Sequence, residues 1–267
     1  MPSRKKRGAG SEGRMSLGQH LIELRKRLFI SAIAIVVFSI GGFLIGDWVL
    51  KAIRKPIELI AKTHGNTTLN YSTIGAAFDV HIQIAITVGV IASSPVWLYQ
   101  VFAFIVPGLT KKEKRYTFGF FFSAVPLFFA GCAAGWWVFP HIVDVLNSFV
   151  PSQDAAITEA KDYLGFVTKL ILAVGIAFVL PVFLVLLNFL GIISGVSIFR
   201  SWRWAILAIF VFCALATPSA DVASMFLLSV PMIVLYLLAA TIAWWRDRIL
   251  AKRAESLADD NSGAAAA

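Results

Sequence analysis

Isolated carboxylates in basic surroundings are the residues of this chain whose placement suggests a chemical role. Glu23 lies between a histidine and three bases, directly before the first long apolar run, in the segment His20-Leu21-Ile22-Glu23-Leu24-Arg25-Lys26-Arg27-Leu28. A segment entering a membrane needs only cations to hold it on the cytoplasmic side, so this acid calls for another purpose. An exposed helical pair with Arg27 contributes only ~0.3 to 0.5 kcal/mol. Glu113 is a second such acid, among the four bases of the segment 111–115.

No set of residues with the spacing of a catalytic or metal site is present. Intramembrane proteolysis requires a serine with a histidine, two buried aspartates, or zinc bound by His-Glu-x-x-His, and the sequence has none of these patterns. Asp79, Asp144 and Asp221 fall at the outer rim that we expect for the helices. The two membrane-proximal histidines, His81 and His141, lack metal-ligand spacing. With no nucleotide-binding motif either, we predict neither an enzyme nor a cofactor.

The composition identifies the elements that must position the two acids. With 58% hydrophobic and 15% charged residues and a mean hydropathy of +0.79, the chain is expected to be an all-α integral membrane protein. Charge-free runs predict six transmembrane helices, of which the fifth is short for a ~30 Å hydrocarbon core. The spans are expected at about 28–47, 79–105, 117–140, 164–190, 203–217 and 222–243.

The distribution of bases predicts the orientation of these spans. Most of the 24 lysines and arginines lie before the first span, in the loops after the second and fourth, and in the tail, which places both termini in the cytoplasm. The net charge of +9 is thus a topology signal, because no folded basic domain for nucleic acid is present. The first apolar run lacks a cleavage motif behind it and should remain as an anchor. We expect a disordered arm at 1–15, a membrane domain at 16–250 and a disordered tail at 251–267.

Several local signals predict how the elements begin and bend. Ser16-Leu17-Gly18-Gln19 fits a capping box that begins a helix at Leu17 and continues it into the first span. The outer segment 55–62 predicts a short surface helix, with Pro56 as a first helical residue. Cys132 and Cys213 are expected to be packing residues. Prolines inside four spans permit kinks, at Pro95, Pro126, Pro181 and Pro231.

Two further motifs, together with the segment 20–28, resemble those of a known family. The segment 94–109, Ser-Pro-Val-Trp-Leu-Tyr-Gln-Val-Phe-Ala-Phe-Ile-Val-Pro-Gly-Leu, leads to Glu113, and Thr-Pro-Ser-Ala-Asp follows at 217–221. From about residue 15 to 248, the chain resembles the TatC family, the core receptor subunits of the twin-arginine protein translocase. The resemblance implies six spans, a cup-shaped bundle with short fifth and sixth helices, and location in a bacterial-type plasma membrane. It also implies binding of twin-arginine signal peptides of folded proteins, with TatA and TatB as partners and the proton gradient as energy source.

The resemblance also assigns roles to individual residues. It implies that Glu23 and Glu113 receive the two signal arginines, with Arg25 and Phe104 in support and His20 and Leu24 beside them. The planar guanidinium group of arginine can donate two parallel hydrogen bonds to one carboxylate, whereas the ammonium group of lysine cannot. Because bases surround both acids, recognition is expected to depend on short-range geometry in a partly desolvated pocket.

Other positions are implied as shaping or partner-contact residues: Pro56, Thr217 and Asp221. Two departures from the family pattern are Val179, where many members have a glutamate, and Met225, where many have a glutamine. Gln83 is the main polar side chain inside the second span, and it either compensates for them or is a helix-packing contact. A small secondary transporter and a membrane scaffold without signal-peptide affinity are the alternative functions.

Overall fold

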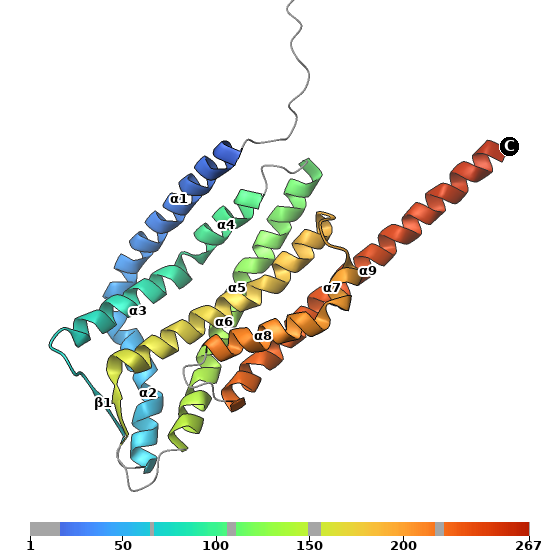
Figure 1. The fold of residues 1–267 in the computed structure, drawn as a ribbon. Helices are drawn as coiled ribbons and strands as arrows, with labels where there is room; N and C mark the ends of the chain where they lie inside the picture. The colour runs from blue at the N-terminus through green and yellow to red at the C-terminus, as the bar shows by residue number, and fades with distance from the viewer. Residues whose placement is uncertain (1–16, 65–66, 106–110, 149–155, 217–221, 267) are drawn as a thin grey trace, which may run out of the picture.

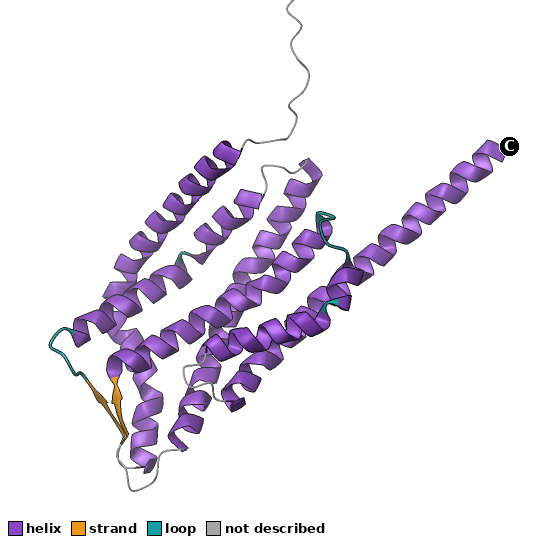
Figure 2. Cartoon of the chain, viewed as in Figure 1, coloured by secondary structure: helices purple, strands orange, loops and turns teal. Residues whose placement is uncertain are grey.

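Helices make up almost all of the chain that the computed structural model describes, namely residues 17–64, 67–105, 111–148, 156–216 and 222–266 (Figures 1 and 2). This confirms the predicted helical class. In chain order the elements are α1 (Leu17–Leu44), α2 (Gly46–His64), β1 (Thr67–Asn70), α3 (Ala76–Ala92), α4 (Ser94–Ile105), α5 (Lys111–Ser148), β2 (Ala156–Glu159), α6 (Ala160–Phe189), α7 (Gly195–Arg200), α8 (Trp202–Ala216) and α9 (Val222–Ala266).

Apolar helices of membrane-crossing length occupy four of the six predicted spans. Among the described residues, segments of α1, α5, α6 and α9 are each long and apolar enough to cross a bilayer. The bent pair α3 and α4 is a fifth candidate, and α8 is a shorter apolar helix of 15 residues, or ~22 Å. The start of α1 and the end of α9 lie toward the same end of the molecule (Figure 1). Six crossings and cytoplasmic termini stay predictions.

The last helix continues far beyond the predicted last span. We expected that span to end near residue 243 and residues 251–267 to lack structure, whereas α9 continues to Ala266. The segment after Trp245 contains no proline and is rich in alanine, the residue with the highest helix propensity. Because this end of α9 projects from the bundle in Figure 1, local propensity and not packing accounts for it.

Close approach of α1 and α3 depends on a small residue. A Cβ at Gly89 would lie 2.8 Å from the backbone N of Ser39 and 2.9 Å from the carbonyl O of Ile35, so only glycine fits this crossing. The opposite face of α1 is exposed, as Phe29 illustrates at 67%. Helix α1 is described from Leu17 and continues into the first apolar run as predicted, whereas Ser16 of the capping box lies outside the described residues, so the capped start stays a prediction. One face of α1 therefore packs on protein and the other is suited to lipid.

The second predicted span, 79–105, is broken into α3 and α4, which meet at an angle of 56°. Ser93 lies at the break, and its N–H donates to the Gly89 carbonyl at 2.9 Å. Pro95 follows in the first turn of α4, where its missing N–H disrupts no helical bond. In contrast, Pro126, Pro181 and Pro231 lie inside helices that continue through them. The bend directs α4 along the first turns of α1.

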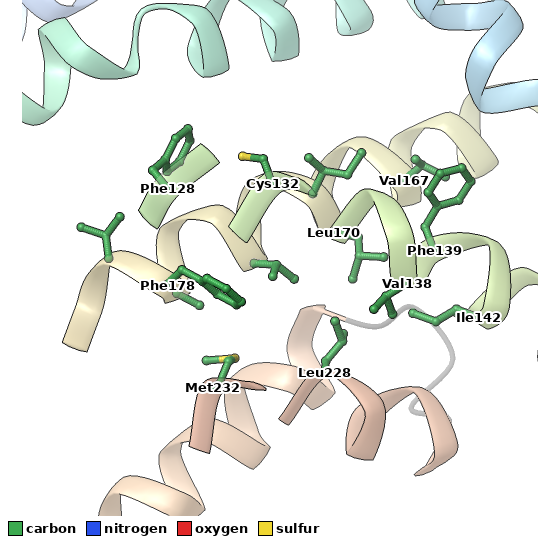
Figure 3. Close-up of a cluster of buried hydrophobic side chains, with 14 of the residues drawn as sticks. Phe128, Cys132, Val138, Phe139, Ile142, Val167, Leu170, Phe178, Leu228 and Met232 are labelled. Carbon is green, nitrogen blue, oxygen red and sulfur yellow. The ribbon is translucent and has the colours of Figure 1, made fainter. Parts of the chain in front are cut away.

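The core is centred on α5 and α6 and includes residues of α2, α3, α4 and α9; Figure 3 shows its part between α5, α6 and α9. Phe128 and Cys132 of α5 pack with Phe178 of α6, and Met232 of α9 closes the cluster from the other side. The Sγ of Cys213 lies 3.7 Å from the Sδ of Met232. Both cysteines are buried, which confirms their predicted packing role.

At the end of the molecule opposite the start of α1, α2 and two short strands join the helices (Figure 1). The predicted short helix is longer than expected, because α2 already begins at Gly46 and Pro56 lies in its interior, not in its first turn. Its buried face includes Ile53, whose carbonyl accepts a hydrogen bond from the Tyr163 hydroxyl at 2.9 Å. Strand β1 pairs in parallel with β2, a contact that we did not predict.

Candidate functional site

Glu23 already accepts a guanidinium within the chain. The Nη2 and Nε of Arg27 donate to Glu23 Oε1 at 2.6 and 3.1 Å, so two donors converge on a single carboxylate oxygen. Within the described residues, the second oxygen, Oε2, accepts no hydrogen bond. The side chains of Glu23 and Arg27 are only 21% and 22% exposed. The pair is thus partly desolvated, unlike the exposed helical pair considered from sequence.

Gln100 connects the ion pair of Glu23 and Arg27 to α4. The Nη1 of Arg27 donates to the Oε1 of Gln100 at 3.2 Å, across 73 positions of sequence. Arg27 is one helical turn from Glu23 on α1, whereas Gln100 is in the middle of α4. Because Gln100 holds the other arm of the guanidinium, the orientation of Arg27 and the presentation of Glu23 depend on the contact between α1 and α4.

An aromatic contact also joins α1 and α4, one or two turns nearer the start of α1. The rings of His20 and Phe104 have centroids 4.3 Å apart and planes at 31°. The structure thus brings together three of the predicted site residues, His20, Glu23 and Phe104, together with Arg27 and Gln100. Leu24 is half-buried on the same turn of α1, and Arg25 is exposed.

An open groove of about 540 Å³ lies beside Glu23. Its walls combine apolar, amide and charged side chains, a mixture suited to a peptide with both apolar and cationic residues. The residues that line it are Gln19, Ile22, Glu23, Lys26, Arg27, Ile30 and Gln100. Lys26 and Arg27 make the groove basic overall, in keeping with the expectation that recognition depends on short-range contacts.

Helix α4, which contains Gln100 and Phe104, packs against α6 through a buried aromatic contact. Phe102 is 1% exposed and stacks on Phe183 of α6, with ring centroids 4.6 Å apart and planes at 14°. Aromatic pairs of this geometry contribute ~0.5 to 1.5 kcal/mol beyond their buried area. The core therefore holds α4 in the position that places Gln100 against α1.

The second predicted acid lies in the first turn of α5. Helix α5 begins at Lys111, so the backbone of Glu113 is helical, while its side chain is outside the described part of the structure. The starts of α1 and α5 and the end of α4 lie at the same end of the molecule (Figure 1). The joint action of Glu23 and Glu113 stays a prediction.

The remaining predicted residues lie away from this groove. Gln83 of α3 donates from Nε2 to Thr168 Oγ1 of α6 at 3.2 Å, which favours the helix-packing interpretation. Pro56 lies in α2, and Met225 is half-buried at the start of α9, where it packs against the core. Thr217 and Asp221 fall outside the described residues.

Val179, the first departure from the family pattern, is 3% exposed and belongs to the core. An uncompensated carboxylate at this buried position would carry a high desolvation cost.

Sequence reasoning did not assign Gln100 to the site, although it lies in the quoted motif. It also missed a polar cluster that joins α6, α7 and α9. Asp247 accepts hydrogen bonds from the Asn188 Nδ2 at 3.0 Å and from the Gly195 N–H at 2.6 Å. Arg246 donates to the Asn188 carbonyl at 2.6 Å. Carbonyls left unpaired at the end of α6 are thus satisfied by α9.

Comparison with known proteins gives consistent matches over most of the chain. The model of the family described as "Sec-independent protein translocase protein (TatC)" matches residues 19–231. The Sec-independent protein translocase protein TatC of Xylanimonas cellulosilytica is 44% identical over 240 residues, covering 90% of this chain and 87% of that protein. TatCy of Bacillus subtilis is 33% identical over 253 residues, covering 93% and 96%. A crystal structure of the twin arginine translocase receptor TatC is similar with a TM-score of 0.72 and 30% identity, covering 84% of this chain and 97% of that one.

Proposed function

The chain belongs to the TatC family of Sec-independent protein translocase proteins, and we propose that it binds the twin-arginine signal peptides of folded proteins through the groove beside Glu23. Members of this family are translocase components and not enzymes.

The observation that carries the proposal is the contact between Glu23 and Arg27. It demonstrates that this carboxylate accepts guanidinium donors at 2.6 and 3.1 Å in a partly buried setting. A signal arginine entering the groove would either bind the remaining oxygen, Oε2, or displace Arg27 from Oε1. In both cases the planar guanidinium group can donate two parallel hydrogen bonds to the carboxylate, a geometry that a lysine ammonium group does not reproduce.

Arg27 also offsets the cost of burying Glu23 before any peptide binds. A half-buried carboxylate without a partner would be strongly disfavoured, whereas here one oxygen is paired and the other is available. Gln100 holds Arg27 from the far side at 3.2 Å, so the acceptor is oriented in advance. A site oriented in this way loses less conformational entropy when the peptide binds.

Glu113 is proposed as the acceptor for the second arginine. Its position in the first turn of α5 places its backbone at the same end of the molecule as Glu23 (Figure 1). A carboxylate near the amino end of a helix interacts favourably with the helix dipole, which is compatible with this role.

The wider setting follows the family and the pattern of charges. We propose six spans with both termini in the cytoplasm of a bacterial-type plasma membrane, and an N-terminal arm at 1–15 ahead of a membrane domain at 16–250. TatA-type and TatB-type subunits are the proposed partners, with Pro56, Thr217, Asp221 and Met225 as candidate contact or shaping positions. The proton gradient is the proposed energy source.

Site-specific photocrosslinking from the groove tests the proposal. A photoreactive residue at Ile22, which lines the groove and is 71% exposed, should crosslink a labelled signal peptide with Arg-Arg much more than one with Lys-Lys. The same probe at Val36, 61% exposed on α1 but outside the groove, is the control position. Equal crosslinking of both peptides at Ile22 would refute the receptor proposal.

Replacing both acids separates a receptor from a scaffold. A scaffold without peptide affinity would support export unchanged in the Glu23→Ala, Glu113→Ala double variant. A receptor would lose export while still assembling with its partner subunits, as measured by co-purification.

A further inference from the structure

Helix α9 has one face packed on the protein and an opposite face that is exposed. Its buried residues recur every three or four positions and include Tyr236, Ala240 and Ala243. Leu238 and Trp245 are 53% and 66% exposed, and each lies two positions from a buried residue, ~200° around the helix. The exposed side chains therefore form a stripe on the side of α9 that faces away from the bundle.

Polar contacts keep this orientation where α9 leaves the bundle. Asp247 accepts hydrogen bonds from the Asn188 side chain and the Gly195 N–H, and Arg246 donates to the Asn188 carbonyl. Both charged residues are half-buried, and they lie on the packed side of the helix. The rotation of α9 is thus set by contacts as far as residue 247, so the positions that follow can be assigned to a face.

The next two bases lie on the exposed stripe. Arg248 and Lys252 follow Trp245 by three and seven positions, and both are exposed. The guanidinium carbon of Arg248 lies 5.3 Å from the centroid of the Trp244 ring. In the part of the chain that the structure describes, no carboxylate is within salt-bridge distance of either base, and Glu255 lies about one turn beyond Lys252. Both bases are thus available to an anionic ligand.

The exposed stripe changes along α9 in the same order as the layers of a bilayer. Tryptophan is typical of the boundary between hydrocarbon and headgroups. With Trp245 at that boundary, Arg248 and Lys252 lie ~4.5 and ~10.5 Å further along the helix axis, and the headgroup layer is ~5 to 7 Å thick. Helical side chains point back toward the amino end of their helix, so both long side chains lean toward the membrane and reach this layer.

We propose that the stripe of Trp245, Arg248 and Lys252 on α9 binds the headgroups of anionic phospholipids. On the topology proposed above, it lies at the cytoplasmic leaflet, whose anionic lipids attract bases near the membrane surface. Each base favours an anionic over a neutral lipid about fivefold, so the two together favour it roughly 25-fold. The interaction is independent of peptide binding, because the groove beside Glu23 is formed by α1 and α4.

Continuity of the stripe favours a lipid over an acidic protein as the ligand. Ten positions separate Leu238 from Arg248, or ~15 Å along the axis, which is half of a ~30 Å hydrocarbon core. A phospholipid whose acyl chain lies against Leu238 therefore has its phosphate close to Arg248, and one molecule contacts both parts of the stripe. An acidic soluble protein would match the bases alone.

Photoreactive lipids test the proposal. The full chain is placed in phosphatidylcholine nanodiscs with a trace of phosphatidylglycerol that carries a diazirine next to the glycerol, and labelled peptides are mapped by mass spectrometry. Labelling of the segment 241–252 should exceed that by the matching phosphatidylcholine probe at least about fivefold, and high salt should reduce the difference. Equal labelling by the two probes at low salt would overturn the proposal.

Charge-matched variants separate this stripe from a general effect of positive charge. The double variant Arg248→Gln, Lys252→Gln should lower phosphatidylglycerol labelling of 241–252 to the phosphatidylcholine level. Its thermal unfolding in pure phosphatidylcholine should be unchanged, because both side chains are exposed. The control Lys51→Gln, Lys55→Gln removes two exposed bases from α2, at the other end of the molecule, and should leave the labelling unchanged. Unchanged labelling in the first variant, or an equal loss in the control, would contradict binding at this stripe.

A photoreactive residue in native membranes distinguishes the two kinds of ligand. Ile249 is exposed and lies beside the stripe, one position after Arg248. A probe at this position should crosslink to phospholipid. Crosslinks to a protein in place of lipid would show that a partner subunit covers the bases, and would overturn the proposal.

Discussion

The substitution Glu23→Gln separates peptide binding from folding, because the structure assigns different magnitudes to the two effects. It removes the charge that Arg27 contacts at 2.6 and 3.1 Å but keeps the size and shape of the side chain. The lost pair within α1 should lower the free energy of unfolding by only about 1 kcal/mol, since it joins neighbouring turns and is partly solvated. A hydrogen-bonded contact between a signal arginine and an ionised acceptor contributes about 1.5 to 3 kcal/mol.

The affinity for an Arg-Arg peptide should therefore fall roughly 10- to 150-fold. The assay is fluorescence anisotropy of a labelled signal peptide titrated with the protein in nanodiscs, together with thermal unfolding of the same samples. Glu58→Gln is the matched control, because Glu58 is an exposed acid on α2 at the other end of the molecule. The affinity of a Lys-Lys peptide, which the proposed site is expected to bind weakly, should change little in either variant.

Two results would refute this reasoning. A loss of less than threefold for the Arg-Arg peptide would mean that Glu23 does not accept a signal arginine. A large drop in thermal stability accompanying the loss of binding would mean instead that the contact between Glu23 and Arg27 mainly holds α1 against α4, and that peptide affinity is lost only indirectly.

Three further changes test the supports of this site and of the fold. Gln100→Leu removes a hydrogen bond worth about 0.5 to 1.5 kcal/mol, so the affinity for the Arg-Arg peptide should fall roughly 2- to 13-fold in the same titration, and an unchanged affinity would exclude a positioning role. Gly89→Ala forces a Cβ to within 2.8 Å of the Ser39 backbone and should lower the free energy of unfolding by about 1 to 3 kcal/mol. The control Gly119→Ala, whose Cβ would have no neighbour within 4 Å, should not lower it. Equal shifts in the thermal unfolding of the two variants would contradict the close approach of α1 and α3. Asp247→Ala leaves the Gly195 N–H unpaired at a cost of about 1 to 3 kcal/mol, so hydrogen exchange in 190–198 should accelerate, and unchanged protection would refute the link between α7 and α9.

Much of the helical layout follows from local sequence patterns. Runs without charge predict where apolar helices lie, since a buried or lipid-facing helix excludes charged residues along its whole length. The break between α3 and α4 lies next to Pro95, where a kink is expected, because proline is tolerated in the first turn of a helix but not in its interior. The extension of α9 to Ala266 was missed, because helix propensity was given too little weight in a polar tail.

The candidate site shows where local patterns stop being informative. Composition marked Glu23 as an acid without an obvious purpose, and family motifs pointed to His20 and Phe104. Neither reveals that Gln100 holds Arg27 across 73 positions, because that contact depends on the 56° bend between α3 and α4. The parallel pairing of β1 with β2 and the hydrogen bond between Asn188 and Asp247 are likewise contacts between distant segments.

By itself, then, the sequence determined that this is a helical membrane protein of a recognisable family, with an isolated acid before its first span. These properties depend on composition and on short-range spacing. Only the tertiary structure decided that Glu23 is paired, partly buried and open to a second donor, because those properties depend on which side chains α4 brings against α1.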